Sequence, residues 1–275
     1  MTDNGSDLAG ELNAYDGAPA GTRLPPFEIA VSPERQKQHH AVSDVDGGPF
    51  GAWADVSIFC QANAEATRRA GLPNDGRLHT RHRVLQAGYI RLDEALTIQG
   101  EIAPYRDGPR GRVLNCHFTF RRADGTVPLR METEHLLPYR EPPLPDRRRQ
   151  AAGGDDADGM RPIGALRITP EKVAGFSPEG GNLIHHDEAF ARARGYRAPL
   201  AQGLMQLAAL HGVIARQGLP WEMDLEIRFR RPVFWDSTLE IMASADGRRL
   251  CCLNEDGKAT ATAELRHLTT ESMEP

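Results

Sequence analysis

Hydrophobic and polar positions alternate most regularly between residues 221 and 233. The apolar positions in this stretch are Trp221, Met223, Leu225, Ile227 and Phe229, and charged residues stand between them. Successive side chains of a β-strand point to opposite faces of its sheet, so a period of two predicts a strand with one buried face. The same alternation over 112–121 places leucine, cysteine and phenylalanine at every second position.

Two stretches predict helices. The first is 52–70, whose core-facing residues are expected to be Trp53, Val56, Phe59, Cys60 and Ala64. The second is 204–214, which is apolar on nearly every side and therefore predicts a helix enclosed by other structure. A short helix over 188–192 is expected between them, because Asp187 can cap its first turn and Gly195 can end it.

The order of these elements predicts an α+β fold. Further strands are expected over 78–86, 95–102, 127–137, 239–245, 249–254 and 259–268. Asp-Gly pairs at 124–125, 246–247 and 256–257 predict turns between strands. A helix that is apolar all round needs a sheet curled about it, and a helix followed by strands favours antiparallel pairing. The pattern therefore predicts a helix wrapped by an antiparallel sheet, twice in one chain.

Polar segments mark the predicted boundaries. Residues 1–26 are rich in Gly, Asp, Asn, Ala and Pro and predict a disordered tail. Residues 139–161 combine Pro, Gly and mixed charge, which is typical of a linker. We therefore expect folded units over 27–138 and 162–268, and a second tail over 269–275.

Composition excludes several classes of function. With 275 residues, 40% of them hydrophobic, the chain can bury a sizeable core. Its formal charge of −5 gives no general attraction to nucleic acid or to anionic membranes. No stretch approaches the roughly 20 apolar residues of a membrane span, and the N-terminus is acidic and polar rather than that of a signal peptide. We expect a soluble, cytoplasmic protein.

Neither zinc nor a disulfide framework is expected. The four cysteines, Cys60, Cys116, Cys251 and Cys252, show no C-x-x-C spacing. His79 and His82 could suggest a metal pair, but strand spacing places them on opposite faces, and we expect structural roles. No metal site and no cofactor are therefore predicted.

The segment 176–205, FSPEGGNLIHHDEAFARARGYRAPLAQGLM, carries the candidate chemistry. It resembles the hydratase 2 motif of the MaoC-like, (R)-specific enoyl thioester hydratases and dehydratases, written D-x-N-P-I-H-x-D, then F-A, then G-[FY]-x-x-P-[IL]-x-H-G-[LM]. The matching positions are Asn182, Ile184, His185, Asp187, Phe190, Ala191, Gly195, Tyr196, Pro199, Leu200, Gly203 and Leu204. Three positions depart from the motif, because the catalytic Asp falls on Gly180, the Pro on Leu183 and the second His on Gln202.

This resemblance implies a double hotdog fold, with the sheets of two units side by side, and a hydro-lyase acting on an enoyl or 3-hydroxyacyl thioester. The acyl carrier would be coenzyme A or a carrier protein, and a homodimer is left open. His185 would move protons, since its unperturbed pKa of about 6.5 suits exchange near neutral pH. The backbone N–H of Gly203, at a helix start, would face the developing oxyanion. Asn182 and Gln202 are further candidates for binding the substrate.

Three alternatives remain for the missing aspartate. Glu179 could supply a carboxylate, because the adjacent Gly180-Gly181 pair allows it to turn inward. His185 could instead act alone, in an elimination whose α proton is already acidic. The site could also bind acyl groups without hydrating them.

The sequence leaves rival functions and two further roles open. The rivals are a catalytically silent acyl-binding or partner subunit and a hotdog enzyme of changed chemistry, such as a thioesterase or cyclase. The first half lacks the motif, so we expect it to widen the acyl tunnel and cover the sheet edge of the second half. Several strand arginines could contact a phosphate-bearing pantetheine or only form a solvent face, namely Arg81, Arg83, Arg228, Arg230 and Arg231.

Overall fold

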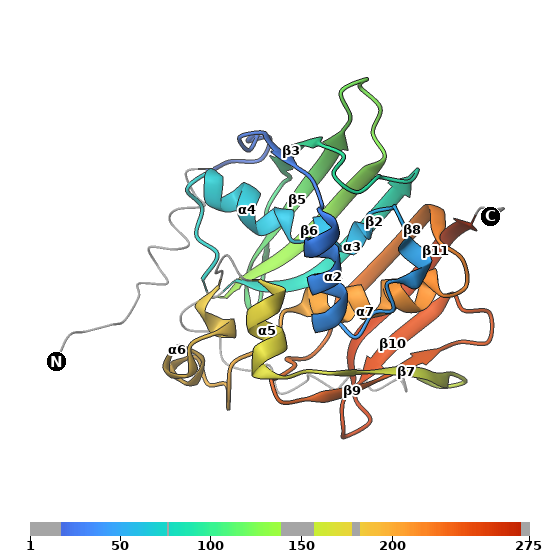
Figure 1. Ribbon diagram of the computed structural model, residues 1–275. Coiled ribbons are helices and arrows are strands. Elements are labelled where there is room, and N and C mark those ends of the chain that lie inside the picture. The colour runs from blue at the N-terminus through green and yellow to red at the C-terminus, as the bar shows by residue number, and fades with distance from the viewer. Residues whose placement is uncertain (1–17, 76, 139–156, 178–181, 271–275) are drawn as a thin grey trace.

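The computed structural model describes residues 18–75, 77–138, 157–177 and 182–270. These residues form an eleven-stranded antiparallel sheet of order β1-β3-β5-β6-β2-β8-β11-β10-β9-β7, with β4 paired to β5 (Figure 1). The strands are β1 (Phe27–Ile29), β2 (Leu78–Ala87), β3 (Leu96–Ile102), β4 (Arg106–Gly108), β5 (Gly111–Arg121), β6 (Leu129–Pro138), β7 (Arg161–Arg167), β8 (Pro220–Phe229), β9 (Thr238–Ala243), β10 (Arg249–Leu253) and β11 (Ala259–Thr270).

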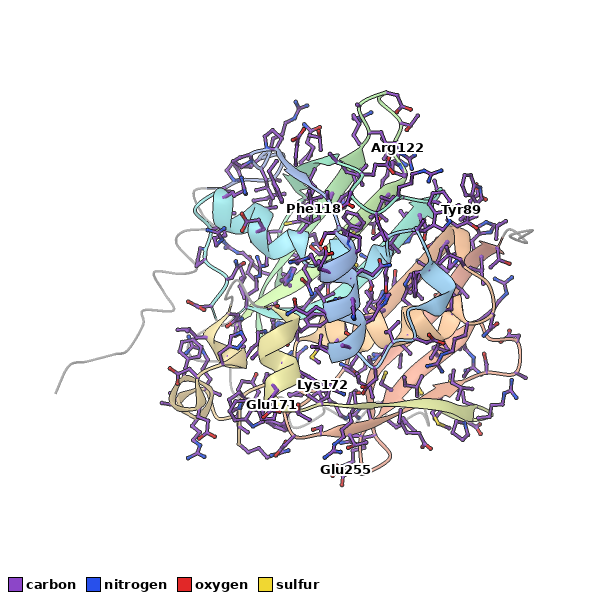
Figure 2. All side chains as sticks on the ribbon, viewed as in Figure 1. Tyr89, Phe118, Arg122, Glu171, Lys172 and Glu255 are labelled. Carbon is purple, nitrogen blue, oxygen red and sulfur yellow. The ribbon has the colours of Figure 1, made fainter. Side chains whose placement is uncertain are left out.

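Helices pack on one side of this sheet (Figure 1). They are α2 (Pro33–Val42), α3 (Val56–Phe59), α4 (Ala62–Arg69), α5 (Pro170–Phe176), α6 (Glu188–Ala193) and α7 (Gly203–Ala215), with short 3₁₀ turns η1 (Gly48–Phe50) and η2 (Leu183–His185). Side chains fill the space between helices and strands, Phe118 of β5 among them (Figure 2). The predicted α+β class is confirmed.

The helix α7 is enclosed as its composition predicts. Every residue from Leu204 to Ala215 is buried, including Gln206 and His211. The short helix α6 begins as expected, because the Asp187 carboxylate accepts a hydrogen bond from Phe190 N at 2.9 Å. Gly195 follows this helix with φ of 81°, a left-handed conformation that glycine adopts at little cost.

The two halves join through one strand pair. β2 of the first half and β8 of the second pair antiparallel, from Arg81 opposite Arg228 to Ala87 opposite Glu222. Without this pairing, the edge of β8 would be exposed. The first half therefore covers the sheet edge of the second, as predicted.

A buried polar network also joins the halves. The fully buried Asp55 carboxylate lies 2.8 Å from Nδ1 of His211 in α7 and 3.0 Å from Nε2 of His40 in α2. Burial alone would raise the pKa of Asp55, but the charge and hydrogen bonds of these histidines hold it well below its ordinary value. The first half is thereby fastened to the central helix of the second.

Several predicted boundaries differ from the structure. The second tail, expected from residue 269, does not begin there, because β11 pairs with β8 as far as Thr270. The helix expected over 52–70 begins only after Asp55, because Ala54 N bonds to Ile90 O and Asp55 caps Ser57 N, and it is divided into α3 and α4. The strand expected to reach residue 233 ends at Phe229, since the N–H groups of the next two residues both turn to Thr260 O.

A further difference concerns the predicted N-terminal tail. Within 18–26, Leu24 is 1% exposed, and its N–H donates to Gly100 O beside β3. One large apolar side chain thus holds a segment whose composition is otherwise polar. No helix in the described residues is long and apolar enough to cross a bilayer.

Candidate active site

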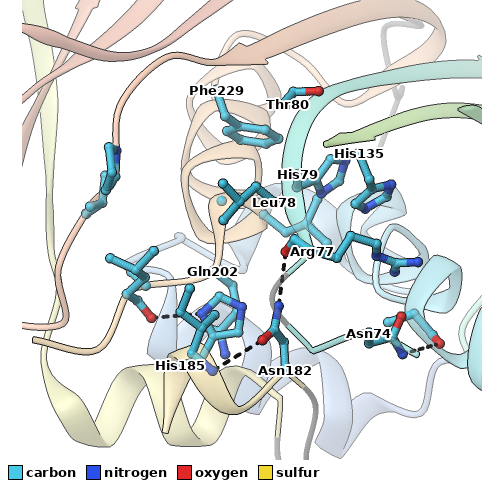
Figure 3. A pocket seen from close by; sticks show the side chains of 18 of the residues that line it. Asn74, Arg77, Leu78, His79, Thr80, His135, Asn182, His185, Gln202 and Phe229 are labelled. Carbon is cyan, nitrogen blue, oxygen red and sulfur yellow. Dashed lines mark hydrogen bonds between the residues drawn. The ribbon is translucent and has the colours of Figure 1, made fainter. Parts of the chain in front are cut away.

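A cavity of about 330 Å³ lies where the two halves meet. The first half supplies one wall from the start of β2 and from β6, and the second half supplies η2, the first turn of α7 and the end of β8 (Figure 3). The lining residues used below are Asn74, Arg77, His79, Thr80, Arg110, His135, Asn182, His185, Gln202, Gly203, Phe229, Arg230 and Arg231.

His185 lines this cavity with a defined protonation pattern. Its Nδ1 lies 2.9 Å from Leu200 O, and a carbonyl oxygen can only accept, so Nδ1 carries the hydrogen. In the neutral ring, Nε2 is therefore left with a lone pair. Burial lowers the pKa of His185 to about 4, against the opposing effect of the bond to Leu200. The ring is neutral at pH 7 and can accept a proton.

Asn182 positions this histidine from the turn before it. Its Oδ1 accepts from Ile184 N at 3.2 Å, which caps η2, and its Nδ2 donates to Arg77 O at 3.0 Å. Leu183 N also donates to Asp75 Oδ1 at 2.9 Å. Asn182 was expected to bind substrate, but these bonds direct its amide to the backbone. The turn that carries His185 is thus held against the first half of the chain.

Gln202 and Gly203 form the start of α7. The Nε2 of Gln202 donates to Val173 O at 3.2 Å, whereas its buried Oε1 has no partner among the described residues. Of the two polar atoms of this candidate substrate-binding side chain, the acceptor is therefore the one without a partner among the described residues.

Gly203 is the first residue of α7, and the first N–H groups of a helix have no partner within the helix. A Cβ at Gly203 would lie 3.0 Å from two ring carbons of Phe229. The Phe229 ring therefore packs closely on this glycine, and Gly203 itself lines the cavity.

The second carboxylate expected from the sequence, that of Glu179, is not among the described residues that line the cavity. Glu179 and Gly180 lie outside the described residues, so the structure places neither. Among the described residues that line the cavity there is no Asp or Glu. Asp187, the nearest carboxylate along the chain, caps α6.

A histidine cluster in the first half was not expected. The rings of His79 and His135 stack with centroids 4.3 Å apart, and those of His79 and His82 lie 5.2 Å apart. The prediction of opposite faces for His79 and His82 is wrong, because a β-bulge between His79 and Arg81 adds a residue and resets the alternation. No local sequence signal marks this bulge.

These rings are neutral. Burial and then the charges of neighbouring groups, Arg77 among them, lower the pKa of His79 and His135 well below 6.5, and burial lowers that of His82 to about 3. No group of three or more His, Cys, Asp or Glu within the described ranges could hold a metal ion.

The strand arginines divide into two sets. Arg81, Arg83 and Arg228 pair with acidic residues on the sheet, for example Arg83 with Asp224 at 2.7 Å and Arg228 with Glu226 at 2.8 Å. Arg230 and Arg231 line the cavity instead. Arg77, which the sequence did not single out, is buried in the cavity wall.

Comparisons with known proteins agree with this architecture. Residues 159–266 match the family described as MaoC like domain. HtdX of Mycobacterium tuberculosis is similar in structure, with a TM-score of 0.71 and 21% identity over 88% of this chain and 99% of that one. A second M. tuberculosis protein, described as having a double hotdog fold, gives a TM-score of 0.62 and 14% identity over 91% and 96% of the two chains.

The full-length peroxisomal multifunctional enzyme type 2 of Drosophila melanogaster is also similar, with a TM-score of 0.68 and 15% identity over 89% of this chain and 48% of that one. No curated protein sequence matches the chain significantly. Together with the sheet and its two helix-covered halves, these findings identify the fold as a double hotdog, within which residues 159–266 match the MaoC like domain.

Proposed function

We propose that the protein is a hydratase or dehydratase that acts on an enoyl or 3-hydroxyacyl thioester of coenzyme A or a carrier protein. The observation that carries this proposal is the position of His185, which lines the same cavity as the start of α7 and whose Nδ1 is bonded to Leu200 O, so that the neutral ring keeps its lone pair on Nε2. This combination supplies a proton acceptor and an oxyanion donor together.

In the hydration direction, His185 Nε2 accepts a proton from water as the water oxygen bonds to the β carbon. The electrons of the α–β double bond move toward the thioester oxygen, which the Gly203 N–H stabilises. The resulting imidazolium then delivers its proton to the α carbon, so that water has added and the ring is neutral again. Dehydration is the reverse sequence.

Because no acidic residue is found among the described residues that line the cavity, two mechanisms of proton transfer are possible. Glu179 supplies the second carboxylate in one, and His185 works alone in the other. Glu179→Gln separates them, because it removes the negative charge while preserving size. A loss of about tenfold or more in kcat would assign a role to Glu179, and an unchanged kcat would assign the proton transfers to His185 alone.

The direct test follows the loss of enoyl absorbance with crotonyl and longer thioesters. We expect His185→Ala to lower kcat by about 10²- to 10⁴-fold, the range of general acid–base catalysis. His117→Ala is the matched control, since His117 is exposed on β5 and does not line the cavity. Equal and negligible rates for wild type and His185→Ala on every substrate would favour a silent acyl-binding subunit.

A further inference from the structure

We infer that the acyl group is carried by coenzyme A rather than by a carrier protein, and that Arg110, Arg230 and Arg231 bind the phosphates of its nucleotide at the mouth of the cavity. This inference rests on the proposed function, because it names the carrier of the thioester that the same cavity accepts. The three residues are called the rim arginines below.

The first observation is the place of the rim arginines. Arg110 follows β4 in the first half, and Arg230 and Arg231 follow β8 in the second. Arg110 and Arg230 are exposed and Arg231 is half-buried, so all three reach solvent while they line the cavity. Burial raises the pKa of Tyr196 in the second half, and the charges of Arg194 and Arg110 oppose this shift. Arg110 therefore lies close to the second half, and positive side chains border the mouth from both halves.

The second observation is that the charge of the rim arginines is not neutralised. Arg230 Nε donates to Thr262 Oγ1 at 3.2 Å, and Arg231 Nη1 donates to Ala259 O. Both acceptors are neutral, so these bonds orient the guanidinium groups without cancelling their charge. No ion pair joins a rim arginine to an acidic residue in the described part of the chain. A cleft bordered by one sign of charge attracts a ligand of the opposite sign.

The third observation is that other polar residues of the cavity wall are satisfied within the protein. Asn74 Nδ2 donates to Ala64 O at 3.0 Å, and Thr80 Oγ1 donates to Glu134 O at 3.1 Å. Arg77 also lines the cavity, but it is only 8% exposed and is bonded to other groups of the protein. The charge that a ligand can reach from solvent therefore lies at the rim arginines.

The number of rim arginines fits a nucleotide. Coenzyme A brings a diphosphate and a separate ribose phosphate, whereas the pantetheine arm of a carrier protein brings one phosphodiester. A guanidinium binds phosphate oxygens with parallel hydrogen bonds, so each of several guanidinium groups can take a phosphate of its own. Three such groups around one mouth match coenzyme A better than a single phosphodiester.

The surface around the mouth does not suit a carrier protein. Carrier proteins are generally acidic, and a specific complex buries about 800 Å² on each partner, so their binding needs basic residues over a wide area. The arginines on the elements next to the mouth are already paired with acidic residues. The pairs are Arg106 with Glu134 at 2.9 Å, Arg192 with Glu188 at 3.1 Å and Arg197 with Asp236 at 2.6 Å.

The experiment measures by calorimetry the binding of saturated, unreactive butyryl thioesters that differ only in the carrier. Butyryl-CoA is compared with butyryl-3′-dephospho-CoA, butyryl-4′-phosphopantetheine and butyryl-pantetheine. We expect butyryl-CoA to bind about ten- to hundredfold more tightly than butyryl-pantetheine, the range for hydrogen bonds to a charged group, with the other two between them. This ratio should fall in higher salt, because exposed charges are screened. Equal affinity for all four thioesters would overturn the proposal without any variant.

The same measurement with the butyryl thioester of a bacterial acyl carrier protein tests the choice of carrier. We expect it to bind no more tightly than butyryl-4′-phosphopantetheine, because the protein part of the carrier finds no wide basic surface here. An affinity equal to or above that of butyryl-CoA would overturn the assignment to coenzyme A.

Variants locate the preference. Arg110→Gln, Arg230→Gln and Arg231→Gln should each lower the ratio of affinities for butyryl-CoA and butyryl-pantetheine severalfold, through weaker binding of butyryl-CoA alone. Arg228→Gln is the matched control, because Arg228 is exposed on β8 but pairs with Glu226 and does not line the cavity. A ratio that persists in all three variants, or falls as far in the control, would overturn the role of the rim arginines.

Two further checks keep the outcome interpretable. If Arg231→Gln does not fold by thermal melting, because it loses the bond to Ala259 O, the two variants of the exposed arginines decide the question. Binding of saturated thioesters needs no hydration step. Preference for coenzyme A without hydratase activity therefore refutes only the catalytic proposal, and hydration of crotonyl-CoA and crotonyl-pantetheine with equal KM refutes only this one.

Discussion

Gly203 has no side chain, and this lets the Phe229 ring pack closely against the start of α7. Since a Cβ at this position would meet the Phe229 ring at 3.0 Å, either the ring or the helix start must shift in Gly203→Ala. We expect a loss of about 1–3 kcal/mol in unfolding free energy, as in other overpacked cores, and a lower kcat. Phe229→Leu in the same chain should restore stability by making room. Denaturant unfolding measures both variants, and a fully stable Gly203→Ala would contradict the packing argument.

Gly180 is the residue at which the chain departs most from the hydratase motif. If the rest of the cavity is ready for hydration, Gly180→Asp should create or raise the activity toward crotonyl-CoA, because it restores the carboxylate that the motif pairs with its histidine. The enoyl absorbance assay measures this gain, with Gly180→Asn as the uncharged control. An equal rate in both variants would show that other residues of the pocket have also diverged.

The turn η2 and its anchors explain how an element of three residues can hold the His185 ring in place. Asn182→Ala removes both the cap of Ile184 N and the bond to Arg77 O. We expect kcat to fall about tenfold or more as His185 loses its position, with a stability loss of about 1 kcal/mol. Asn182→Asp keeps the accepting oxygen but loses the donor, so its kcat should be intermediate. A lower melting temperature with wild-type kcat would limit Asn182 to a structural role.

Elements with a strong local period could be predicted from the sequence, and elements held by distant contacts could not. The strand β8 and the helix α7 follow from their own hydrophobic patterns, as does the cap of α6 by Asp187. The helix α2 was not predicted, because its buried residues are Gln36, His39 and His40, whose polar side chains are satisfied by groups far along the chain.

The same division applies to the site. His185 and Gly203 belong to one continuous motif, so the sequence could nominate them together. Arg77 and His135 reach the cavity only because β2 and β6 pair in the first half, and the bulge after His79 could not be foreseen from alternation. Residues that come together only when separate strands pair share no local pattern in the sequence. The cavity wall from the first half could therefore not be predicted.

For the molecule as a whole, buried neutral histidines predict sensitivity to acid. Burial lowers the pKa of His39 to about 4 and that of His82 to about 3. It also lowers the pKa of His135 well below 6.5. Below pH 6.5 the unfolded chain therefore binds more protons than the folded one. The stability present above pH 6.5 is lost as pH falls toward 4, by up to about 1.4 kcal/mol per pH unit for each such histidine.

Denaturant midpoints at pH 7.5, 6 and 5 measure this loss. His82→Leu should flatten the dependence, because it removes a ring that is fully buried and whose nitrogens have no partner among the described residues. The exposed His117→Ala should leave the dependence unchanged. Midpoints that do not move over this pH range would show that these rings are not held neutral in the folded protein.

The pairing of β2 with β8 has one more consequence, which concerns symmetry. In an assembly of two identical subunits, every substitution is made twice, once on each side of the shared seam. Here one polypeptide contributes both sides, so a change at Arg77 has no duplicate beside His185. The wall that the first half supplies and the wall that carries His185 can therefore be altered independently of each other.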